Sequence, residues 1–336
     1  MTENEVNKNG YPDISSIQNL NIQNAFIVAK NKLEQSYAPV CSISGGADSD
    51  IMLDLIYRSD EGHKTKYVFF DTGLEFQATR KHLAELQDKY GIEIETLKAV
   101  KPIPTCVKKY GVPFLSKRVS DYMMRLQANN FQWEDDSFEN LIIKYPHCKV
   151  ALRWWCNLWG EGSSFNISRN KWLKEFLIEN PPAFPISNKC CHYAKKLVAH
   201  NFEKQTEMDL SMTGVRKAEG GARASAYKNC FTPPNEKTAV SYYRPLFWFT
   251  KEDKEQYEER FNIVHSDCYK VWGMKRTGCC GCPYGRDFEQ ELALAQKYEP
   301  KMYKAMVSIF GEAYEYTRLY KRFCEKKDEE KKQNKE

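Results

Sequence analysis

Short apolar runs alternate with amphipathic stretches over the first third of this chain. Residues 38–43 predict a buried strand that ends at two glycines, and a helical pattern follows it. A second strand at 67–70, a helix over 76–90 and a third strand at 92–97 continue the alternation. Strands and helices that alternate at this spacing form β-α-β units, whose strands are parallel. The sequence therefore predicts an α/β fold built on a doubly wound parallel sheet.

The alternation breaks over residues 116–186, which look helical, end in a proline-rich stretch and carry five of the seven tryptophans. Strand-like sequence resumes at 208–213, and a Thr-x-x-Asp capping box predicts a helix that starts at Thr250. Two or three helices, broken near Pro300 and Gly311, are expected over 287–326. The expected segments are a polar tail at 1–20, the first half of the α/β domain at 21–115, a helical tryptophan-rich insertion at 116–186, the second half of the α/β domain at 187–250, a helical C-terminal region at 251–326 and a charged tail at 327–336.

The tryptophan-rich insertion has two interpretations. Its tryptophans are interleaved with basic residues and can stack the bases of RNA or DNA. A small helical subdomain also needs an aromatic core of its own, and this second interpretation is the favoured one.

Composition limits the classes of protein to which the chain can belong. At 336 residues with 42% hydrophobic residues, it is long enough for one large or two modest domains and is not globally disordered. No apolar run approaches the ~20 residues that cross a bilayer, and the N-terminus has no secretory signal, so we expect no membrane partner and a cytoplasmic location. The twelve cysteines are then expected to be reduced thiols or metal ligands. A net charge of +5 suits an enzyme for anionic small molecules.

The segment from Ser44 to Ser49 links the first predicted strand to the first helix and has the composition of a phosphate-binding loop. Its two glycines let the backbone approach a phosphate, and its amides point outward at a helix N-terminus, where the helix dipole favours an anion. The two serine hydroxyls can donate to the same oxygens. Asp48 would repel phosphate unless Mg²⁺ lies between them or the carboxylate caps the helix. An ordinary tight turn is the alternative, which the order Ser-Gly-Gly-x-Asp-Ser makes the weaker one.

This loop resembles the pyrophosphate loop (PP-loop) of the ATP pyrophosphatases and of their relatives, the phosphoadenosine phosphosulfate reductase family. Four further segments match motifs of that family in the same order. They are Phe70-Asp-Thr-Gly73, Gly214-Val-Arg-Lys-Ala-Glu219 with Arg223 beyond it, Arg244-Pro-Leu-Phe-Trp-Phe-Thr250, and Lys275-Arg-Thr-Gly-Cys279 with Cys282-Pro283. The resemblance implies a HUP-like domain that binds an adenine nucleotide and an enzyme of sulfur metabolism.

The resemblance also implies roles for individual residues. The catalytic candidates are Asp48, Asp71, Arg216 and Arg223. The residues expected to hold the nucleotide are Ser44, Gly45, Gly46, Ala47, Ser49, Thr72, Gly73, Gly214, Lys275 and Arg276. Asp71, at the carboxyl end of a strand, is placed for contact with a metal or a ribose, and equally for capping the following turn. Arg216 and Arg223 suit a sulfate or phosphate oxyanion, although Glu219 between them can simply be their ion-pair partner.

Two cysteine pairs, Cys190-Cys191 and Cys279-x-x-Cys282, supply four thiols, and a proline follows the second pair. Cys-x-x-Cys segments that end in proline recur in iron–sulfur proteins, whereas adjacent cysteines make a poor zinc site. The pattern resembles the cluster-bearing adenosine phosphosulfate reductases, which implies a 4Fe-4S cluster held by both pairs. Zinc and plain thiols are the alternatives, and Cys280 can replace Cys279 as a ligand. The remaining cysteines are expected to be small buried hydrophobes.

Three functions fit these motifs. The first is an ATP-dependent sulfur-transfer enzyme that forms AMP and pyrophosphate, with Mg²⁺, a sulfur donor protein and an acceptor such as tRNA or DNA. The second is a reductase of phosphoadenosine phosphosulfate (PAPS) or adenosine phosphosulfate (APS), which uses a reductant protein and releases sulfite through a cysteine. The third is a nucleotide-binding module without activity. The loop is intact, and Cys324 lacks the Glu-Cys-Gly-x-His setting of the family's reductases, so the first function is the expected one.

Overall fold

The computed structural model describes residues 10–220, 226–236 and 238–334. The chain forms two compact units, each of which combines two separate stretches. Unit 1 comprises Met1–Val100 and Lys195–Cys279, and unit 2 comprises Lys101–Ala194 and Cys280–Glu336. The divisions expected from the sequence differ from these, largely because residues 251–279 contain helices that pack in unit 1.

Unit 1 is built on a single sheet, to which the described residues contribute six strands. The strands are β1 (Pro39–Ile43), β2 (Lys66–Asp71), β3 (Ile94–Lys98), β4 (Leu210–Thr213), β5 (Phe231–Thr232) and β6 (Ser241–Tyr243). Their order is β3-β2-β1-β4-β6-β5, and all neighbours are parallel except β5 with β6. The four longer strands confirm the parallel sheet that the sequence predicts. The sequence pattern does not indicate β5 and β6, which have only two and three residues.

Helices cover both faces of this sheet. Among the described residues, the α-helices of unit 1 are α1 (Leu20–Gln35), α2 (Ala47–Ser59), α3 (Gln77–Tyr90), α10 (Leu197–Gln205), α12 (Lys251–Phe261) and α13 (Asp267–Lys270). Residues of α1, α2, α3 and α12 share one hydrophobic cluster with Cys41 of β1, whereas Phe202 of α10 packs with Val40 in another. Because successive strand residues point to opposite faces, Val40 and Cys41 mark the two layers. The sheet is therefore doubly wound, as predicted.

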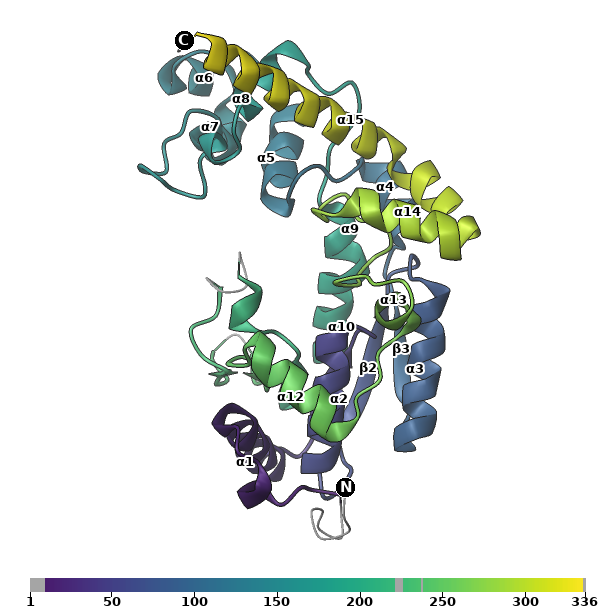
Figure 1. Ribbon diagram of the computed structural model, residues 1–336. Coiled ribbons are helices and arrows are strands. Elements are labelled where there is room, and N and C mark those ends of the chain that lie inside the picture. The colour runs from purple at the N-terminus through teal and green to yellow at the C-terminus, as the bar shows by residue number, and fades with distance from the viewer. Residues whose placement is uncertain (1–9, 221–225, 237, 335–336) are drawn as a thin grey trace. The chain divides into compact units, whose positions relative to one another are not determined.

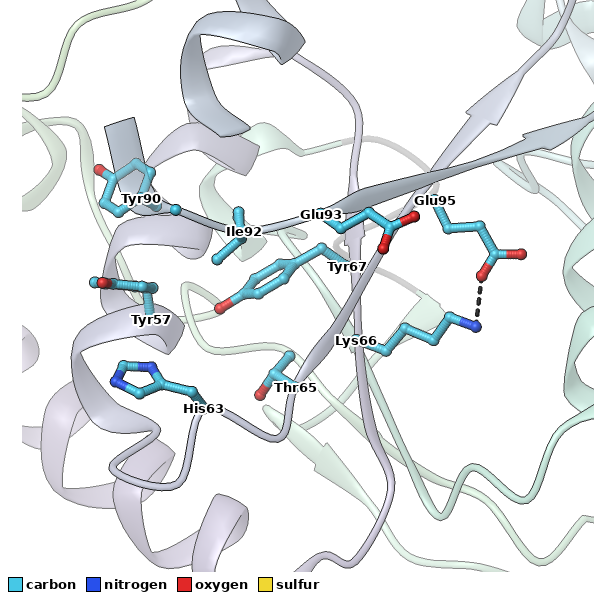
Figure 2. A pocket seen from close by; sticks show the side chains of 10 residues that line it. Tyr57, His63, Thr65, Lys66, Tyr67, Tyr90, Ile92, Glu93 and Glu95 are labelled. Carbon is cyan, nitrogen blue, oxygen red and sulfur yellow. Dashed lines mark ion pairs between the residues drawn. The ribbon is translucent and has the colours of Figure 1, made fainter. Parts of the chain in front are cut away.

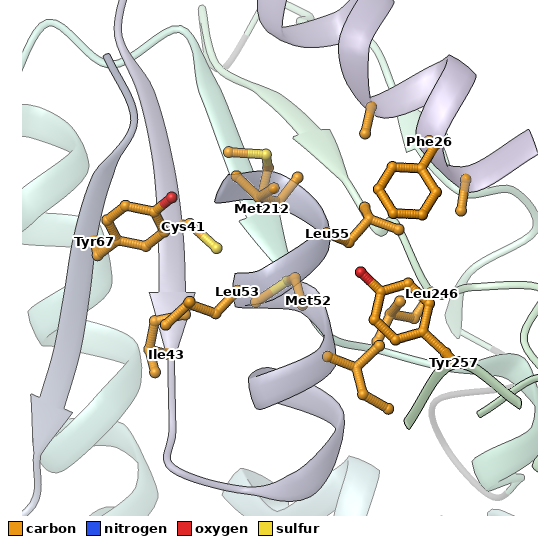
Figure 3. Close-up of a cluster of buried hydrophobic side chains, with 14 of the residues drawn as sticks. Phe26, Cys41, Ile43, Met52, Leu53, Leu55, Tyr67, Met212, Leu246 and Tyr257 are labelled. Carbon is orange, nitrogen blue, oxygen red and sulfur yellow. The ribbon is translucent and has the colours of Figure 1, made fainter. Parts of the chain in front are cut away.

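Helix α2 is central to the core of unit 1. Its residues Met52, Leu53 and Leu55 are fully buried. Figure 3 shows Leu53 beside Ile43 of β1, while Leu55 faces Phe26 of α1. Burying a large aliphatic side chain stabilises a fold by roughly 1.5–3 kcal/mol, so α2 fastens the helices of this layer to the sheet.

The N-termini of α1 and α12 are joined by one carboxylate. Asn19 caps α1 by accepting from the amides of Asn21 and Ile22, and its own side-chain amide donates to Asp253 at 2.7 Å. The backbone amide of Thr250 donates to the Asp253 carboxylate, and the backbone amide of Asp253 donates to the Thr250 hydroxyl. This reciprocal pair is the capping box predicted at Thr250.

Asp54 is a fully buried carboxylate in the middle of α2. It accepts from Arg58 at 2.7 Å, from the hydroxyl of Tyr90 in α3 at 2.8 Å and from that of Tyr257 in α12 at 2.8 Å. The carboxylate therefore ties two neighbouring helices to α2.

Unit 2 is helical and has an aromatic core. Its helices are α4 (Ile103–Tyr110), α5 (Lys117–Gln127), α6 (Phe138–Lys144), α7 (Lys149–Trp155), α8 (Leu173–Glu179), α9 (Lys189–Cys191), α14 (Phe288–Tyr298) and α15 (Pro300–Gln333). Trp154 and Trp155 are buried in one cluster with Trp133. Arg153 and Lys174 lie over the rings of Trp159 and Trp155. The favoured interpretation, in which the tryptophans form a core, is confirmed.

Helix α15 is continuous from Pro300 to Gln333 (Figure 1). The break expected near Pro300 is confirmed, but the one expected near Gly311 is wrong. A glycine inside a helix costs about 1 kcal/mol, and here the buried neighbours Phe310 and Tyr314 offset that cost by packing. No helix formed by the residues described combines the length and apolar composition that spanning a membrane requires.

The two expected tails contain ordered structure. Within the N-terminal tail, Tyr11 and Ile17 are buried against the core of unit 1. The charged C-terminal tail is helical as far as Gln333, and Asp328 within it pairs with Lys171 at 2.6 Å. A polar composition at the N-terminal end and a run of charges at the C-terminal end therefore misled the prediction.

Replacing Asp54 should destabilise unit 1. Asp54→Ala would leave Arg58 without its carboxylate and two tyrosine hydroxyls without an acceptor, so we expect a loss of about 3–5 kcal/mol in the free energy of unfolding. Urea denaturation followed by circular dichroism measures it. The exposed pair Lys30–Glu61 offers the control, because Glu61→Ala should cost no more than about 1 kcal/mol. Equal losses in both variants would contradict the proposed role of Asp54.

Candidate functional site

Strand β1 lies where the direction of the strand connections reverses. The chain runs from β1 outward to β2 and β3, and then returns to β4 on the other side of β1. Such a switch point leaves a crevice outside the carboxyl ends of the strands, where α/β sheets bind ligands. Gly214, just after β4, approaches this point closely: a Cβ atom there would lie 3.2 Å from the carbonyl oxygen of Asp48. The structure thus brings Gly214 to the predicted phosphate loop.

The loop between β1 and α2 is held in shape by Ser49. The Ser49 hydroxyl donates to the Gly46 carbonyl at 2.9 Å and accepts from the amides of Ser44 and Gly46 at 3.2 Å. Gly45 has a φ of 67°, and a Cβ atom there would lie 2.7 Å from the side chain of Thr79, so the position requires glycine. The proton of the Ser49 hydroxyl is therefore already engaged by the Gly46 carbonyl. The expected donation from Ser49 to a phosphate stays a prediction.

Asp48 is paired with two cations. Its carboxylate lies 3.0 Å from Nε of Arg216, which follows β4, and 3.2 Å from Nζ of Lys254 in the first turn of α12. These charges offset the repulsion between Asp48 and a phosphate, and Mg²⁺ beside this residue stays a prediction. No motif in the sequence marks Lys254, although the capping box at Thr250 indicates the helix turn that positions it.

Asp50 is buried beneath the loop between two histidines. Its carboxylate lies 2.8 Å from Nδ1 of His265 and 3.0 Å from Nε2 of His82, and Nε2 of His265 meets Glu258 at 2.8 Å. Burial lowers the pKa of His265, but the hydrogen bonds to Asp50 and Glu258 outweigh it and raise the pKa to about 9. His265 therefore carries a positive charge at neutral pH. No motif marks either histidine in the sequence.

The residues that follow β2 bind one another. Asp71 accepts from the Gly73 amide at 2.9 Å and pairs with Arg80 at 2.9 Å. Burial raises the pKa of Asp71, but the bonds from Arg80 and Gly73 outweigh it and leave the pKa below its ordinary value. The Thr72 hydroxyl donates to the buried Glu75 at 2.7 Å. The interpretation of Asp71 as a capping residue is confirmed, while its contact with metal or ribose stays a prediction.

A segment after α12 lies against the glycine that caps α2. A Cβ atom at Gly46 would lie 3.3 Å from the Tyr269 hydroxyl and 3.3 Å from the Thr277 hydroxyl. These two hydroxyls are 2.9 Å apart, and the Thr277 amide donates to Tyr269 at 3.0 Å. Burial raises the pKa of Tyr269, against hydrogen bonds from the Thr277 side chain and from the amides of Ala47 and Thr277. The closing motif of the sequence contains Thr277, but nothing in the pattern singles out Tyr269.

The remaining candidates stay predictions. Arg223 lies outside the described residues. Glu219 accepts from the backbone amide of Arg216 at 3.2 Å, while the Arg216 guanidinium pairs with Asp48. Lys275 and Arg276 are exposed.

The thiols of the two cysteine pairs differ in exposure. Cys190 is buried, and Cys191, Cys279 and Cys282 are half-buried, whereas Cys280 is fully buried. Throughout the part of the chain that the structure describes, no three His, Cys, Asp or Glu side chains are grouped so that they could hold a metal ion. The ligand set expected from the sequence therefore remains a prediction. Several other cysteines are buried as expected, namely Cys41, Cys106, Cys148 and Cys268.

Tyr284 connects the two cysteine segments of unit 2. Burial raises the pKa of its hydroxyl most, and Cys190, Cys191 and Cys282 are close enough to raise it further, against the effect of Ser120. The hydroxyl is buried, and Ser120 is a polar neighbour of it among the described residues. A buried donor thus lies near thiols that are far apart in the sequence.

A separate pocket of about 570 Å³ opens beside the amino ends of β2 and β3 (Figure 2). Its lining includes Tyr57, His63, Tyr67, Tyr90 and the ion pair between Lys66 and Glu95. None of the predicted nucleotide-binding residues lines this pocket, because they follow the carboxyl ends of the strands. The pocket is therefore distinct from the candidate site.

Residues 38–140 match the family model of the phosphoadenosine phosphosulfate reductase domain. The matched stretch begins at β1 and includes the loop Ser44–Ser49 and the turn after β2. This segment is thus similar to a phosphoadenosine phosphosulfate reductase domain. The family resemblance expected from the sequence is confirmed for it.

The individual proteins to which the chain is similar are distant from it. A protein of Methanocaldococcus jannaschii, described as uncharacterized, is 29% identical over 154 residues, which are 46% of this chain and 30% of that protein. The phosphoadenylyl-sulfate reductase of Candida auris, solved as a phosphate complex, is similar with 13% identity and a TM-score of 0.41, over 79% of this chain and 91% of that one. The U34-tRNA thiolase NcsA of Methanococcus maripaludis, solved with its [4Fe-4S] cluster, is similar with 15% identity and a TM-score of 0.36. The similarity covers 97% of this chain and 89% of that one.

The charge on His265 should make the stability of unit 1 depend on alkaline pH. Because folding raises its pKa from 6.5 to about 9, its contribution is fully present below pH 6.5 and is lost as the pH rises through 9. That difference in pKa corresponds to at most about 3 kcal/mol. Unfolding free energies measured between pH 6 and 10 should therefore fall for the wild type and fall less for His265→Gln. His200→Gln, at an exposed position of α10, should keep the wild-type profile; identical profiles for all three proteins would refute the assignment.

Proposed function

We propose that this chain binds the phosphates of an adenine nucleotide at Ser44–Ser49 and uses ATP to activate an acceptor for sulfur transfer. The observation that carries the proposal is the position of the loop. It lies at the switch point of the sheet, at the N-terminus of α2, with Gly214 packed against its backbone. Backbone amides at a helix N-terminus are suited to bind phosphate oxygens.

The proposed reaction divides ATP between its α and β phosphates. An oxygen atom of the acceptor attacks the α phosphorus, the bond from that phosphorus to the bridging oxygen breaks, and pyrophosphate leaves. A sulfur nucleophile from a donor protein then displaces AMP from the acceptor, which can be a tRNA base or DNA. In this scheme the loop amides hold the departing pyrophosphate, where donors aimed at developing charge contribute most.

Arg216 and Lys254 are the cations of this scheme. Both lie within 3.2 Å of Asp48, beside the loop. They offset the negative charge of Asp48 before the nucleotide arrives, and Arg216 has the planar geometry that suits phosphate oxygens. We assign them to positioning the phosphates that leave.

The alternative is a reductase of PAPS or APS, in which a cysteine attacks sulfur. Cys324 is the C-terminal candidate for that nucleophile. Burial raises the pKa of its thiol, and its Sγ donates to the carbonyl oxygen of Lys171 at 3.5 Å. Because the thiolate is the nucleophile, a raised pKa opposes attack. This environment favours the ATP-dependent reaction.

We further propose that Cys190, Cys191, Cys279 and Cys282 hold a 4Fe-4S cluster. Four thiolates are the donor set of such clusters. The buried Tyr284 hydroxyl near three of these thiols supports the proposal, because hydrogen bonds to ligand sulfurs are a common feature around clusters. When bound, the cluster would supply an iron site for sulfur, and the chain's own contribution is to hold it through these thiols.

Crowding the loop should abolish nucleotide binding. Gly46→Val would place side-chain atoms against the hydroxyls of Ser44, Tyr269 and Thr277, so we expect loss of measurable ATP affinity in calorimetry with Mg²⁺. Gly311→Ala is the control, because nothing lies within 4 Å of a Cβ atom there. Unchanged affinity for ATP, PAPS and APS in Gly46→Val would place the nucleotide elsewhere. Sulfite release from PAPS or APS with thioredoxin, lost on Cys324→Ser, would favour the reductase.

The cluster should be visible in protein prepared without oxygen. We expect brown protein with about four irons per chain, and loss of iron on Cys190→Ser or Cys282→Ser. Cys230→Ser, which removes a half-buried thiol of unit 1, should retain the iron. Comparing the iron content of Cys279→Ser with that of Cys280→Ser identifies which of these two cysteines is a ligand. Colourless protein with one equivalent of zinc would exclude the cluster.

A further inference from the structure

Two hydroxyls occupy the space directly in front of the phosphate loop. A Cβ atom added to Gly46 would lie 3.3 Å from both the Tyr269 and the Thr277 hydroxyl oxygens. This distance is shorter than an ordinary van der Waals contact, so even a single added carbon atom is crowded there. A phosphate group, which is larger, does not fit between Gly46 and these hydroxyls. The residues before the cysteine pair therefore close this side of the loop.

The segment that carries these hydroxyls is packed onto the helices around the loop. The Trp272 ring meets Phe76 edge to face at 5.2 Å, and Cys268 Sγ lies 3.9 Å from the Thr79 hydroxyl in α3. Just before α13, His265 is bonded to Asp50 of α2. Contacts with both α2 and α3 hold Tyr269 at the loop.

The Tyr269 oxygen acts there as an acceptor. The Thr277 amide donates to it at 3.0 Å. The oxygen also lies against Gly46, the residue that caps α2, and the neighbouring Ala47 amide is near enough to lower the pKa of the hydroxyl. The amides at the start of a helix are the groups that bind phosphate oxygens. A hydroxyl oxygen that lies against the first residues of α2 therefore stands where a phosphate oxygen would bind.

We propose that the Tyr269 hydroxyl, supported by Thr277, occupies a phosphate-oxygen position of the loop in the free protein and is displaced when the nucleotide binds. This inference rests on the proposed function of the loop. The exchange replaces a neutral acceptor with a charged one, and hydrogen bonds to charged groups are roughly twice as strong. Nucleosides without phosphates gain nothing from the exchange, so the hydroxyl makes the site selective for phosphorylated ligands.

Displacement would also reach the second cysteine pair. Thr277 precedes Cys279 by a single residue, Gly278, and the Thr277 amide and hydroxyl both bind Tyr269. When a phosphate releases Tyr269, Thr277 loses these bonds. Nucleotide binding therefore alters the backbone that leads into the Cys-x-x-Cys segment.

The test is the affinity of full-length Tyr269→Phe for inorganic pyrophosphate and for ATP, measured by calorimetry. Phenylalanine keeps the ring but leaves the Ala47 amide open, so both ligands should bind about five-fold more tightly, the equivalent of one neutral hydrogen bond. Tyr242→Phe is the matched control, because its hydroxyl binds Glu203 instead, and its affinities should equal those of the wild type. Weaker binding by Tyr269→Phe would show that the hydroxyl is a ligand of the phosphate, and unchanged binding would show that it is a bystander. Either result overturns the proposal.

A second variant separates this inference from the proposed function. Thr277→Val removes the supporting hydroxyl while preserving shape, and it should tighten pyrophosphate binding in the same direction even if Tyr269→Phe fails to fold, which thermal unfolding would reveal. If the wild type binds pyrophosphate and ATP but neither variant binds more tightly, only the displacement is wrong. If the wild type and both variants bind neither ligand, the loop is not a nucleotide site and both proposals fall.

Discussion

Three carboxylates on α2 have to be compensated because that helix is buried between the sheet and other helices. A charged group removed from water costs several kcal/mol unless it is paired and hydrogen-bonded. Asp54 draws in α3 and α12 through tyrosine hydroxyls, Asp50 draws in two histidines, and Asp48 draws in Arg216 and Lys254. The same helix begins at the phosphate loop. The need to pair its acids thus assembles the surroundings of that loop.

Much of unit 1 could be predicted because its signals are local. Apolar runs of strand length and the two glycines after β1 fixed the parallel sheet and the position of the loop. The short strands β5 and β6 carry too few residues to show a period. The continuity of α15 through Gly311 also escaped prediction, since packing of Phe310 and Tyr314 overrides the low helix propensity of one glycine.

The candidate site could be predicted only in part, for a different reason. Motifs located the loop, Gly214 and Arg216, which the structure brings together. Lys254, His265 and Tyr269 stand in no recognisable motif. Each belongs to the site because its side chain contacts a residue of the loop or of α2 about two hundred positions earlier. Such pairings depend on the tertiary fold, which neither composition nor periodicity records. The same limit applies to the cysteines, whose types are evident from the sequence but whose grouping is not.

The shared start of α1 and α12 has a consequence for the order of synthesis. Asn19 reaches its partner Asp253 across 234 positions of the chain. A ribosome adds ~5–20 residues per second, so α1 waits roughly 12–47 s for that carboxylate to be made. During this interval Phe26, which is buried against Tyr257 and Phe261 in the finished protein, has no α12 to cover it. Helix α1 is thus translated long before α12 covers it, and until then the nascent chain presents an apolar surface on which chaperones can act.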